Sequence, residues 1–334
     1  MEHPSRVGKY EVEEFLGGGM SRVYRAKDSV LGRRVALKVL AETSASDPEA
    51  KARFLHEARI ASSTAHENII AVYDFGEEHG RPFMVMEFLE GGSLREAIEH
   101  QRTGDFARRM QIGLQVGRAI GHIHQKKIVH RDIKPENINV DALGRAKLMD
   151  FGIAKSDSVH LTQTGMTLGT PYYMSPEQVL GQDVTTQADV YSFGVLMYEL
   201  MTGKKPIEGE NYEKIFHKIL YDPLNLEPLH EAGVAPAAID LIRKCLAKAP
   251  AERPQGFGII CSAIEEILRQ GALQPRAVPT ALAMEPSDEG ELPAFLQALP
   301  APLRTSGGLA LLSGIATLLV MAVVYFALRL ARVI

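Results

Sequence analysis

The pattern of apolar residues changes near residue 90, and this change constrains the fold more than any other feature of the sequence. Before it, short alternating stretches predict β-strands over residues 10–16, 23–27, 34–40, 69–75 and 83–88. One helix is expected among them over residues 47–64, with Asp47 as its N-cap and Pro48 at its first position. After it, helical patterns cover residues 94–101, 105–126, 176–180, 187–202, 211–220, 236–247 and 256–269. We therefore expect an α+β fold of two lobes, the first rich in strands and the second helical, with a ligand cleft between them.

The end of the chain has a different composition. Residues 271–306 hold six prolines, seven alanines and four acidic residues, which predicts a disordered linker. Residues 309–328 carry no charged side chain, and a helix of that length spans about 30 Å, the thickness of the bilayer core. A buried helix of a soluble domain is the alternative, but such a helix normally keeps a polar stripe and this one has none. We expect a single transmembrane helix over residues 309–328, with the linker beside the membrane.

Charge and cysteine content exclude several classes of function. The net charge is −4, whereas a nucleic-acid-binding chain is usually basic, so no nucleic acid partner is expected. The two cysteines, Cys245 and Cys261, form no closely spaced pair. The sequence therefore indicates neither a zinc site nor a disulfide framework, and both cysteines are expected to be small buried residues.

One stretch after the predicted helix 105–126 carries groups that can accept a proton or bind a metal ion. It begins His130-Arg131-Asp132, and Asn137 follows five residues after the aspartate. An aspartate in such a loop can accept the proton of a hydroxyl group, and an asparagine can offer its carbonyl oxygen to a metal ion. Asp150 follows a predicted strand over residues 146–149, and carboxylate oxygens suit the hard ion Mg²⁺.

The strand-rich lobe contributes three further motifs. The run Val35-Ala36-Leu37-Lys38 ends a predicted strand with a lysine, and Glu57 lies 19 residues later on the predicted helix. Three glycines, residues 17–19, separate the first two long strands. An apolar stretch over residues 83–89 runs into a Glu-Gly-Gly turn and has the character of a connection between lobes.

Taken together, these motifs resemble the protein kinase family, specifically the eukaryotic-like (Hanks-type) serine/threonine kinases of bacteria, over residues 10–268. The resemblance implies that Asp132 is the catalytic base and that Lys134 contacts the γ-phosphate of ATP. It implies that Lys38, paired with Glu57, holds the α- and β-phosphates. Asn137 and Asp150 would bind Mg²⁺ or Mn²⁺. The implied ATP-binding residues are Leu16, Gly17, Gly18, Gly19, Met20, Ser21, Arg22, Val23, Tyr24, Lys38, Glu87 and Leu89, with Met86 as the gatekeeper.

The glycine-rich turn departs from the family pattern. Bacterial relatives often read Leu-Gly-x-Gly-Gly-Met-(Gly/Ser)-x-Val, and the run from Leu16 to Val23 is one residue shorter. Ser21 stands where the third glycine of the family motif is expected. We expect this shorter turn to weaken the affinity for ATP moderately while leaving catalysis in place.

The resemblance also implies phosphorylation control and two structural braces. Thr162 and Thr164 match the autophosphorylation sites of bacterial relatives, and Arg131 would pair with a phosphate placed there. Thr170, like Lys134, indicates a Ser/Thr rather than a Tyr specificity. Asp189 would brace the backbone of the catalytic loop, residues 130–137, and Arg253 would pair with Glu177.

The sequence thus predicts a serine/threonine protein kinase that transfers the γ-phosphoryl group of ATP to protein hydroxyls. We expect a single-pass protein of the cell (inner) membrane with its kinase domain in the cytoplasm, where ATP is found, and a possible homodimer for autophosphorylation in trans. Two alternatives stay open: a pseudokinase scaffold, which the altered glycine turn would favour, and a small-molecule kinase on the same fold.

Overall fold

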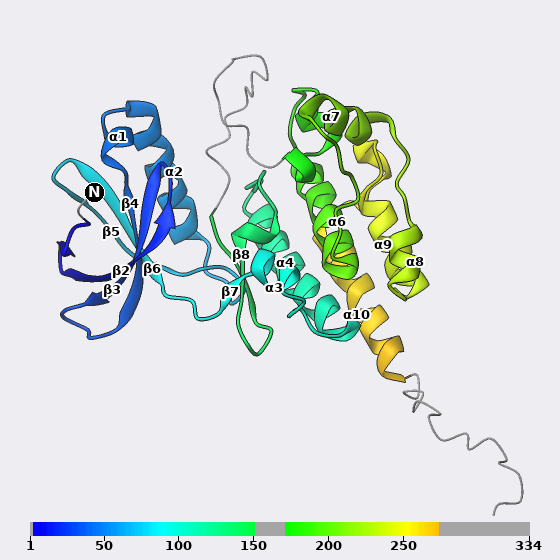
Figure 1. Cartoon of the computed structure of the whole chain (residues 1–334), viewed down its shortest axis with the longest axis horizontal. Helices are drawn as coiled ribbons and strands as arrows, with labels where there is room; N and C mark the ends of the chain where they lie inside the picture. The colour runs from blue at the N-terminus through cyan, green and yellow to red at the C-terminus, as the bar shows by residue number, and fades with distance from the viewer. Residues whose placement is uncertain (1–2, 151–170, 274–334) are drawn as a thin grey trace, which may run out of the picture. The chain divides into compact units, whose positions relative to one another are not determined.

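The strand-rich part of the chain forms one antiparallel sheet of six strands in the order β1-β2-β3-β4-β6-β5 (Figure 1). The computed structural model describes residues 3–150 and 171–273, and they belong to one compact unit, Met1–Gln274. The strands of this sheet are β1 (Arg6–Val7), β2 (Tyr10–Gly18), β3 (Ser21–Asp28), β4 (Arg34–Leu40), β5 (Val72–Glu78) and β6 (Arg81–Glu87).

Strand β4 is buried on both faces because both of its alternating sets of side chains are apolar or paired. Val35, Leu37 and Val39 pack on one face, in a cluster with side chains of β2, β3 and β6. Ala36 and Leu40 point to the other face and pack with residues of α2 (Pro48–Ser63). Lys38 shares this second face by the same period of two, so the register of β4 directs its side chain toward α2.

Helix α2 begins as the sequence predicts. The side chain of Asp47 accepts a hydrogen bond from the backbone N–H of Glu49, and Pro48 occupies the first helical position, where its missing N–H costs nothing. Ala50, Phe54, Ala58 and Ala61 are buried at helical spacing. The helix therefore lies against the sheet along one stripe (Figure 1).

A second, three-stranded sheet of short strands joins the two parts of the fold. It contains β7 (Gly92–Ser93), β8 (Ile138–Val140) and β9 (Ala146–Leu148). Ile69 forms an isolated parallel bridge with Leu148, and the N–H of Ile70 donates to the carbonyl of Leu148 at 3.0 Å. The strand predicted over residues 69–75 therefore begins only at Val72, because Ile69 and Ile70 contact β9 instead.

The remaining described residues are mainly helical, and they pack around α6 (Thr186–Thr202), whose residues from Ala188 to Met201 are all buried. The other helices are α3 (Leu94–Glu99), α4 (Phe106–Gln125), α5 (Pro176–Val179), α7 (Tyr212–Tyr221), α8 (Glu227–Glu231), α9 (Pro236–Cys245) and α10 (Phe257–Leu273), with 3-10 turns η1 (Pro135–Asn137), η3 (Pro171–Tyr173) and η4 (Pro250–Glu252). Two short helices, α8 and α1 (Glu42–Ala45), were not predicted. Cys245 is buried as expected and unpaired, whereas Cys261 is only half-buried.

Helix α10 extends further than the sequence pattern predicts. It runs to Leu273, so the first residues assigned to the linker 271–306 are helical. Among the helices of the described part, none combines the length and apolar character that a membrane crossing requires. The predicted span over residues 309–328, and the linker beyond residue 273, lie outside the described residues.

Candidate active site

Lys38 and Glu57 form the ion pair that the family resemblance implies. The ammonium Nζ of Lys38 donates to Glu57 Oε1 at 2.7 Å and to Asp150 Oδ1 at 2.8 Å. Burial alone would lower the pKa of Lys38, but the charges of Asp150 and Glu57 raise it, so the ammonium form is stabilised. Burial raises the pKa of Glu57. This cluster links β4, α2 and Asp150, two residues after β9, and it holds the Lys38 ammonium group in a fixed position.

Asp132 is held in place by two neighbours on its own loop. Lys134 Nζ lies 2.8 Å from Asp132 Oδ2. The amide Nδ2 of Asn137 donates to the backbone oxygen of Asp132 at 2.8 Å and to its Oδ2 at 3.0 Å. Because Nδ2 faces Asp132, the carbonyl oxygen of the Asn137 side chain is turned to a different direction and can serve a metal ion.

Asn137 and Asp150 are brought together by the hairpin of β8 and β9. The N–H of Met149 donates to the backbone oxygen of Asn137 at 2.8 Å, and Asp150 is the next residue. An amide oxygen and a carboxylate are both hard oxygen donors, the set that Mg²⁺ prefers. These two residues therefore fit a divalent cation such as Mg²⁺.

The backbone of the catalytic loop is strained at Arg131, which has a φ of 65° although it is not glycine. Asp189, on the buried helix α6, accepts hydrogen bonds from the N–H groups of His130 and Arg131, both at 2.8 Å. The ring Nε2 of His124 also lies 2.7 Å from Asp189. The brace predicted for Asp189 is thus present, and it holds the strained residue beside Asp132.

The glycine-rich turn continues the pairing of β2 and β3 to its tip, where Gly18 pairs with Arg22. Gly17 and Gly18 have φ of 140° and 130°, values that side chains rarely permit. A Cβ atom on Gly18 would lie 2.0 Å from the backbone oxygen of Ser21. The close turn thus requires glycine at Gly18, and Met20 at its tip is 68% exposed. Its effect on ATP affinity stays a prediction.

The predicted hinge follows strand β6. Met86, the predicted gatekeeper, is buried. The N–H of Glu87 donates to the backbone oxygen of Ala71 at 2.8 Å, and its carboxylate lies 2.8 Å from Lys147 Nζ. With its N–H occupied, Glu87 can offer an adenine base only its backbone oxygen. Leu89 is half-buried two residues later.

A charged cluster centred on Arg95 was not predicted from the sequence. Its guanidinium donates to Glu136 Oε1 at 2.9 Å, to Glu199 Oε1 at 2.7 Å and to the hydroxyl of Tyr173 at 2.5 Å. The Tyr173 hydroxyl in turn donates to Glu199. Arg95 thereby ties α3 to the catalytic loop, η3 and α6. Glu136 lies in the predicted catalytic loop, but no short motif links it to Arg95, so no local signal points to the cluster.

The second predicted brace, between Arg253 and Glu177, is also present. Arg253 NH1 lies 2.7 Å from Glu177 Oε1, and NH2 lies 2.8 Å from Oε2, with both side chains buried. It fixes the start of α5. Thr162, Thr164 and Thr170 lie outside the described residues.

Comparison with known proteins agrees with this arrangement. The family model for the protein kinase domain matches residues 10–270. The chain is 40% identical over 248 residues to the serine/threonine-protein kinase PrkC of Bacillus subtilis, covering 74% of the chain and 38% of that protein. It is 39% identical over 282 residues to PknA of Mycobacterium tuberculosis, covering 82% of the chain and 64% of that protein.

A third relative, the probable serine/threonine-protein kinase SCO3848 of Streptomyces coelicolor, is 38% identical over 264 residues, which cover 76% of the chain and 39% of that protein. The matches thus span less than two thirds of each of these relatives. The range matched by the family model includes Lys38, Asp132 and Asp150. The chain therefore belongs to the protein kinase family, among the eukaryotic-like serine/threonine kinases of bacteria.

Proposed function

We propose that the chain transfers the γ-phosphoryl group of ATP to serine and threonine hydroxyls of proteins. One observation carries this proposal. Lys38 is fixed between Glu57 and Asp150, while Asp132 is fixed by Lys134 and Asn137. A scaffold without turnover would need neither arrangement, and the names of the bacterial relatives further support a Ser/Thr protein kinase.

Each of these side chains has a task in the proposed transfer. Asp132 accepts the proton of the attacking hydroxyl, and Lys134 lies close enough to Asp132 to neutralise charge near the γ-phosphate. A P–O ester bond to the hydroxyl forms as the bond to the β-phosphate oxygen breaks, and ADP leaves. Lys38 would hold the α- and β-phosphates. A divalent cation held by Asn137 and Asp150 would supply charge neutralisation at the phosphates.

The first test is phosphate transfer from radiolabelled ATP to a generic basic protein. We expect incorporation by the unaltered chain and a loss on the order of 10²-fold in the Lys38→Met variant, because one preorganised charge at the phosphates is removed. Absence of transfer by the unaltered chain would favour the pseudokinase scaffold. Transfer to small alcohols or amines, but not to the protein, would favour the small-molecule kinase.

We further propose autophosphorylation at Thr162 or Thr164, with a homodimer for reaction in trans. The support is the match of these threonines to the sites of bacterial relatives and the position of Arg131 beside Asp132. Mass spectrometry after incubation with ATP is expected to find phosphate on one or both. A Thr162→Ala/Thr164→Ala variant should lose activity toward other proteins. An unphosphorylated pair and a fully active variant would refute this regulation.

Membrane anchoring is proposed from the uncharged run 309–328, with the kinase domain in the cytoplasm. Alkaline carbonate washing of membranes from cells expressing the full chain should leave it in the pellet. The expected result for a variant with Leu318 and Leu319 both changed to Arg is release into the supernatant, because charges near the bilayer centre oppose insertion. Release of the unaltered chain by the same wash would contradict the proposal.

A further inference from the structure

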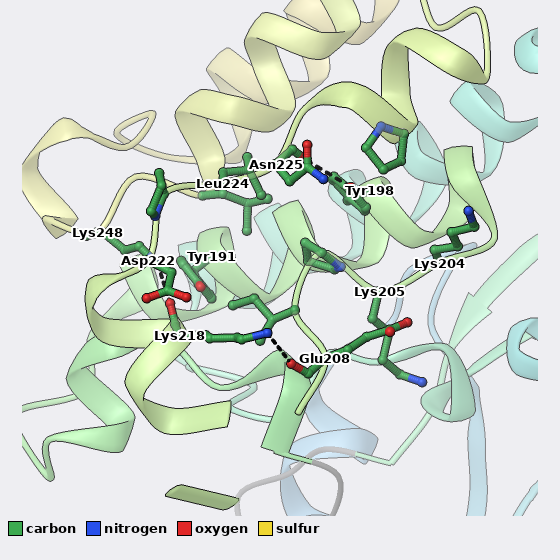
Figure 2. Close-up of a pocket in the computed structure, with 15 residues that line it drawn as sticks. Tyr191, Tyr198, Lys204, Lys205, Glu208, Lys218, Asp222, Leu224, Asn225 and Lys248 are labelled. Carbon is green, nitrogen blue, oxygen red and sulfur yellow. Dashed lines mark hydrogen bonds between the residues drawn. The ribbon is translucent and has the colours of Figure 1, made fainter. Parts of the chain in front are cut away.

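A cavity of about 360 Å³ lies in the helical part, and none of its lining residues belongs to the candidate active site. Its wall comes from α6, the loop after it, α7, the segment leading to α8, and the segment after α9 (Figure 2). A volume of this size admits one or two side chains of a bound peptide, or a small molecule.

Part of the wall is apolar and firmly packed. Tyr191 and Tyr198, seven residues apart on α6, are both 1% exposed, and Leu246 is also buried. The hydroxyl of Tyr198 donates to the backbone oxygen of Asn225 at 2.9 Å, so its polar group is already satisfied. The apolar surface that is open to a ligand comes from side chains that are exposed or half-buried: Ile207, Leu224, Pro206, Pro223 and Pro228. This surface suits an apolar side chain.

The rest of the wall is positively charged. Four lysines line the cavity, Lys204, Lys205, Lys218 and Lys248, against two carboxylates, Glu208 and Asp222, which leaves an excess of two positive charges. Lysines on an open surface are usually just solvated, but the ammonium groups of Lys218 and Lys248 are held in fixed positions, as their hydrogen bonds show.

Backbone oxygens hold these two ammonium groups. Lys218 Nζ donates to the oxygen of Glu208 at 2.8 Å. Lys248 Nζ donates to the oxygens of Lys218 at 3.0 Å and Ile219 at 2.6 Å, near the end of α7. Neither forms an ion pair with a carboxylate within the described part of the chain. Each ammonium has three N–H groups, so two remain on Lys218 and one on Lys248 for an anionic ligand.

The surroundings strengthen the attraction for anions. Lys248 is half-buried, so water is partly excluded around it, and this burial lowers the pKa of its ammonium group. Charge interactions are stronger in such a place than at an open surface. Several lining residues, Lys204, Glu208, Pro223 and Asn225, are exposed, so the cavity opens to solvent and admits a segment of a longer chain.

We propose that this cavity binds an acidic peptide segment of a partner protein, with one apolar side chain seated against Ile207 and Leu224 and the peptide's carboxylates on Lys218 and Lys248. The inference concerns binding alone and stands apart from the proposed catalytic function. Charge complementarity carries it: a ligand with an apolar anchor and flanking carboxylates matches both halves of the wall.

The test is fluorescence anisotropy with the full chain and a labelled ten-residue peptide, in the absence of ATP. The peptide carries one phenylalanine flanked by four glutamates, with glycine and alanine elsewhere, so it offers no hydroxyl to phosphorylate. We expect saturable binding that weakens as NaCl is raised, because exposed charges are screened. Lys218→Gln should weaken binding about fivefold, the scale of one partly exposed ion pair.

Lys214→Gln is the matched control, because Lys214 lies one turn earlier on α7, pairs with Glu210 and does not line the cavity. It should bind the peptide as the unaltered chain does. A second variant, Lys204→Glu, guards against misfolding, since Lys204 is exposed and its side chain forms no bond among the described residues. It should also weaken binding about fivefold or more.

Several results would overturn the proposal. If the unaltered chain and both cavity variants bind the peptide equally well, these lysines do not contribute to binding. If a peptide with glutamine in place of each glutamate binds as tightly, the negative charges of the peptide are not recognised. If a peptide with alanine in place of the phenylalanine binds as tightly, the cavity holds no apolar anchor. If inorganic phosphate at the concentration of the peptide displaces it, the cavity is a simple anion site and not a peptide site.

Discussion

The Asp132→Asn variant is expected to lose phosphoryl transfer by 10²- to 10⁴-fold, the range that a positioned acid or base typically contributes. Asparagine has nearly the shape of aspartate and can still accept the hydrogen bond from Asn137 Nδ2. It cannot take the proton of the attacking hydroxyl. The fold of the loop should therefore survive while the proposed chemistry is lost.

ATP affinity separates this effect from a general defect. Asp132 contacts Lys134 and Asn137, whereas Lys38, the proposed phosphate ligand, contacts Glu57 and Asp150. Titration calorimetry should therefore find the dissociation constant for ATP within about threefold of the unaltered value, a change below 1 kcal/mol. Turnover is measured with radiolabelled ATP and the generic basic protein.

The control for this variant is Asp240→Asn. Asp240 lies on the surface of α9, where it pairs with Arg243 and Lys244, far along the chain from the catalytic loop. It should keep full activity. If Asp132→Asn retained more than a tenth of the turnover of the unaltered chain, Asp132 would not be the catalytic base.

Local motifs explain how much of this site the sequence predicts. The pairings of Lys38 with Glu57 and of Arg253 with Glu177 are readable because each partner sits in a short run of typical residues. The limits of β4 are also predicted to the residue, since its apolar run is bounded by charged and loop residues. Strand β8, three residues long, is not readable because pairing with β7 and β9 defines it.

The Arg95 cluster marks the limit of sequence reasoning. Arg95 lies 41 residues from Glu136, 78 from Tyr173 and 104 from Glu199. No short pattern in the sequence links these residues, and only the packing of α3 beside the catalytic loop and α6 brings them together. The lysine-lined cavity could not be predicted from the sequence for the same reason, because its lining comes from five separate segments.

A second large effect is expected from Arg253→Ala, which should lower the free energy of unfolding by about 3–5 kcal/mol. All five N–H groups of the guanidinium are used. Two bind Glu177, and the others bind the backbone oxygens of Gln187, Ala247 and Lys248. The side chain is fully buried and also lies over the ring of Tyr191. Its removal leaves Glu177 as an unpaired buried charge, together with a void.

Replacement by lysine tests whether charge alone is enough. Lysine carries one ammonium with three N–H groups, so it cannot reproduce the two-pronged contact with Glu177 and three backbone bonds at once. Arg253→Lys should therefore recover only part of the lost stability. In urea unfolding, the midpoints should fall in the order unaltered chain, Arg253→Lys, Arg253→Ala.

The matched control is Arg243→Ala, which breaks an exposed ion pair with Asp240 on α9. Exposed pairs contribute about 0–1 kcal/mol, so this variant should unfold close to the unaltered midpoint. If Arg253→Ala lowered the free energy of unfolding no more than Arg243→Ala does, the buried ion pair would not stabilise the fold more than an exposed one. A large cost confined to Arg253 would show that the start of α5 is anchored by this contact. Loss of activity in the Arg253 variants would then follow from unfolding, whereas in Asp132→Asn it would occur in a folded protein.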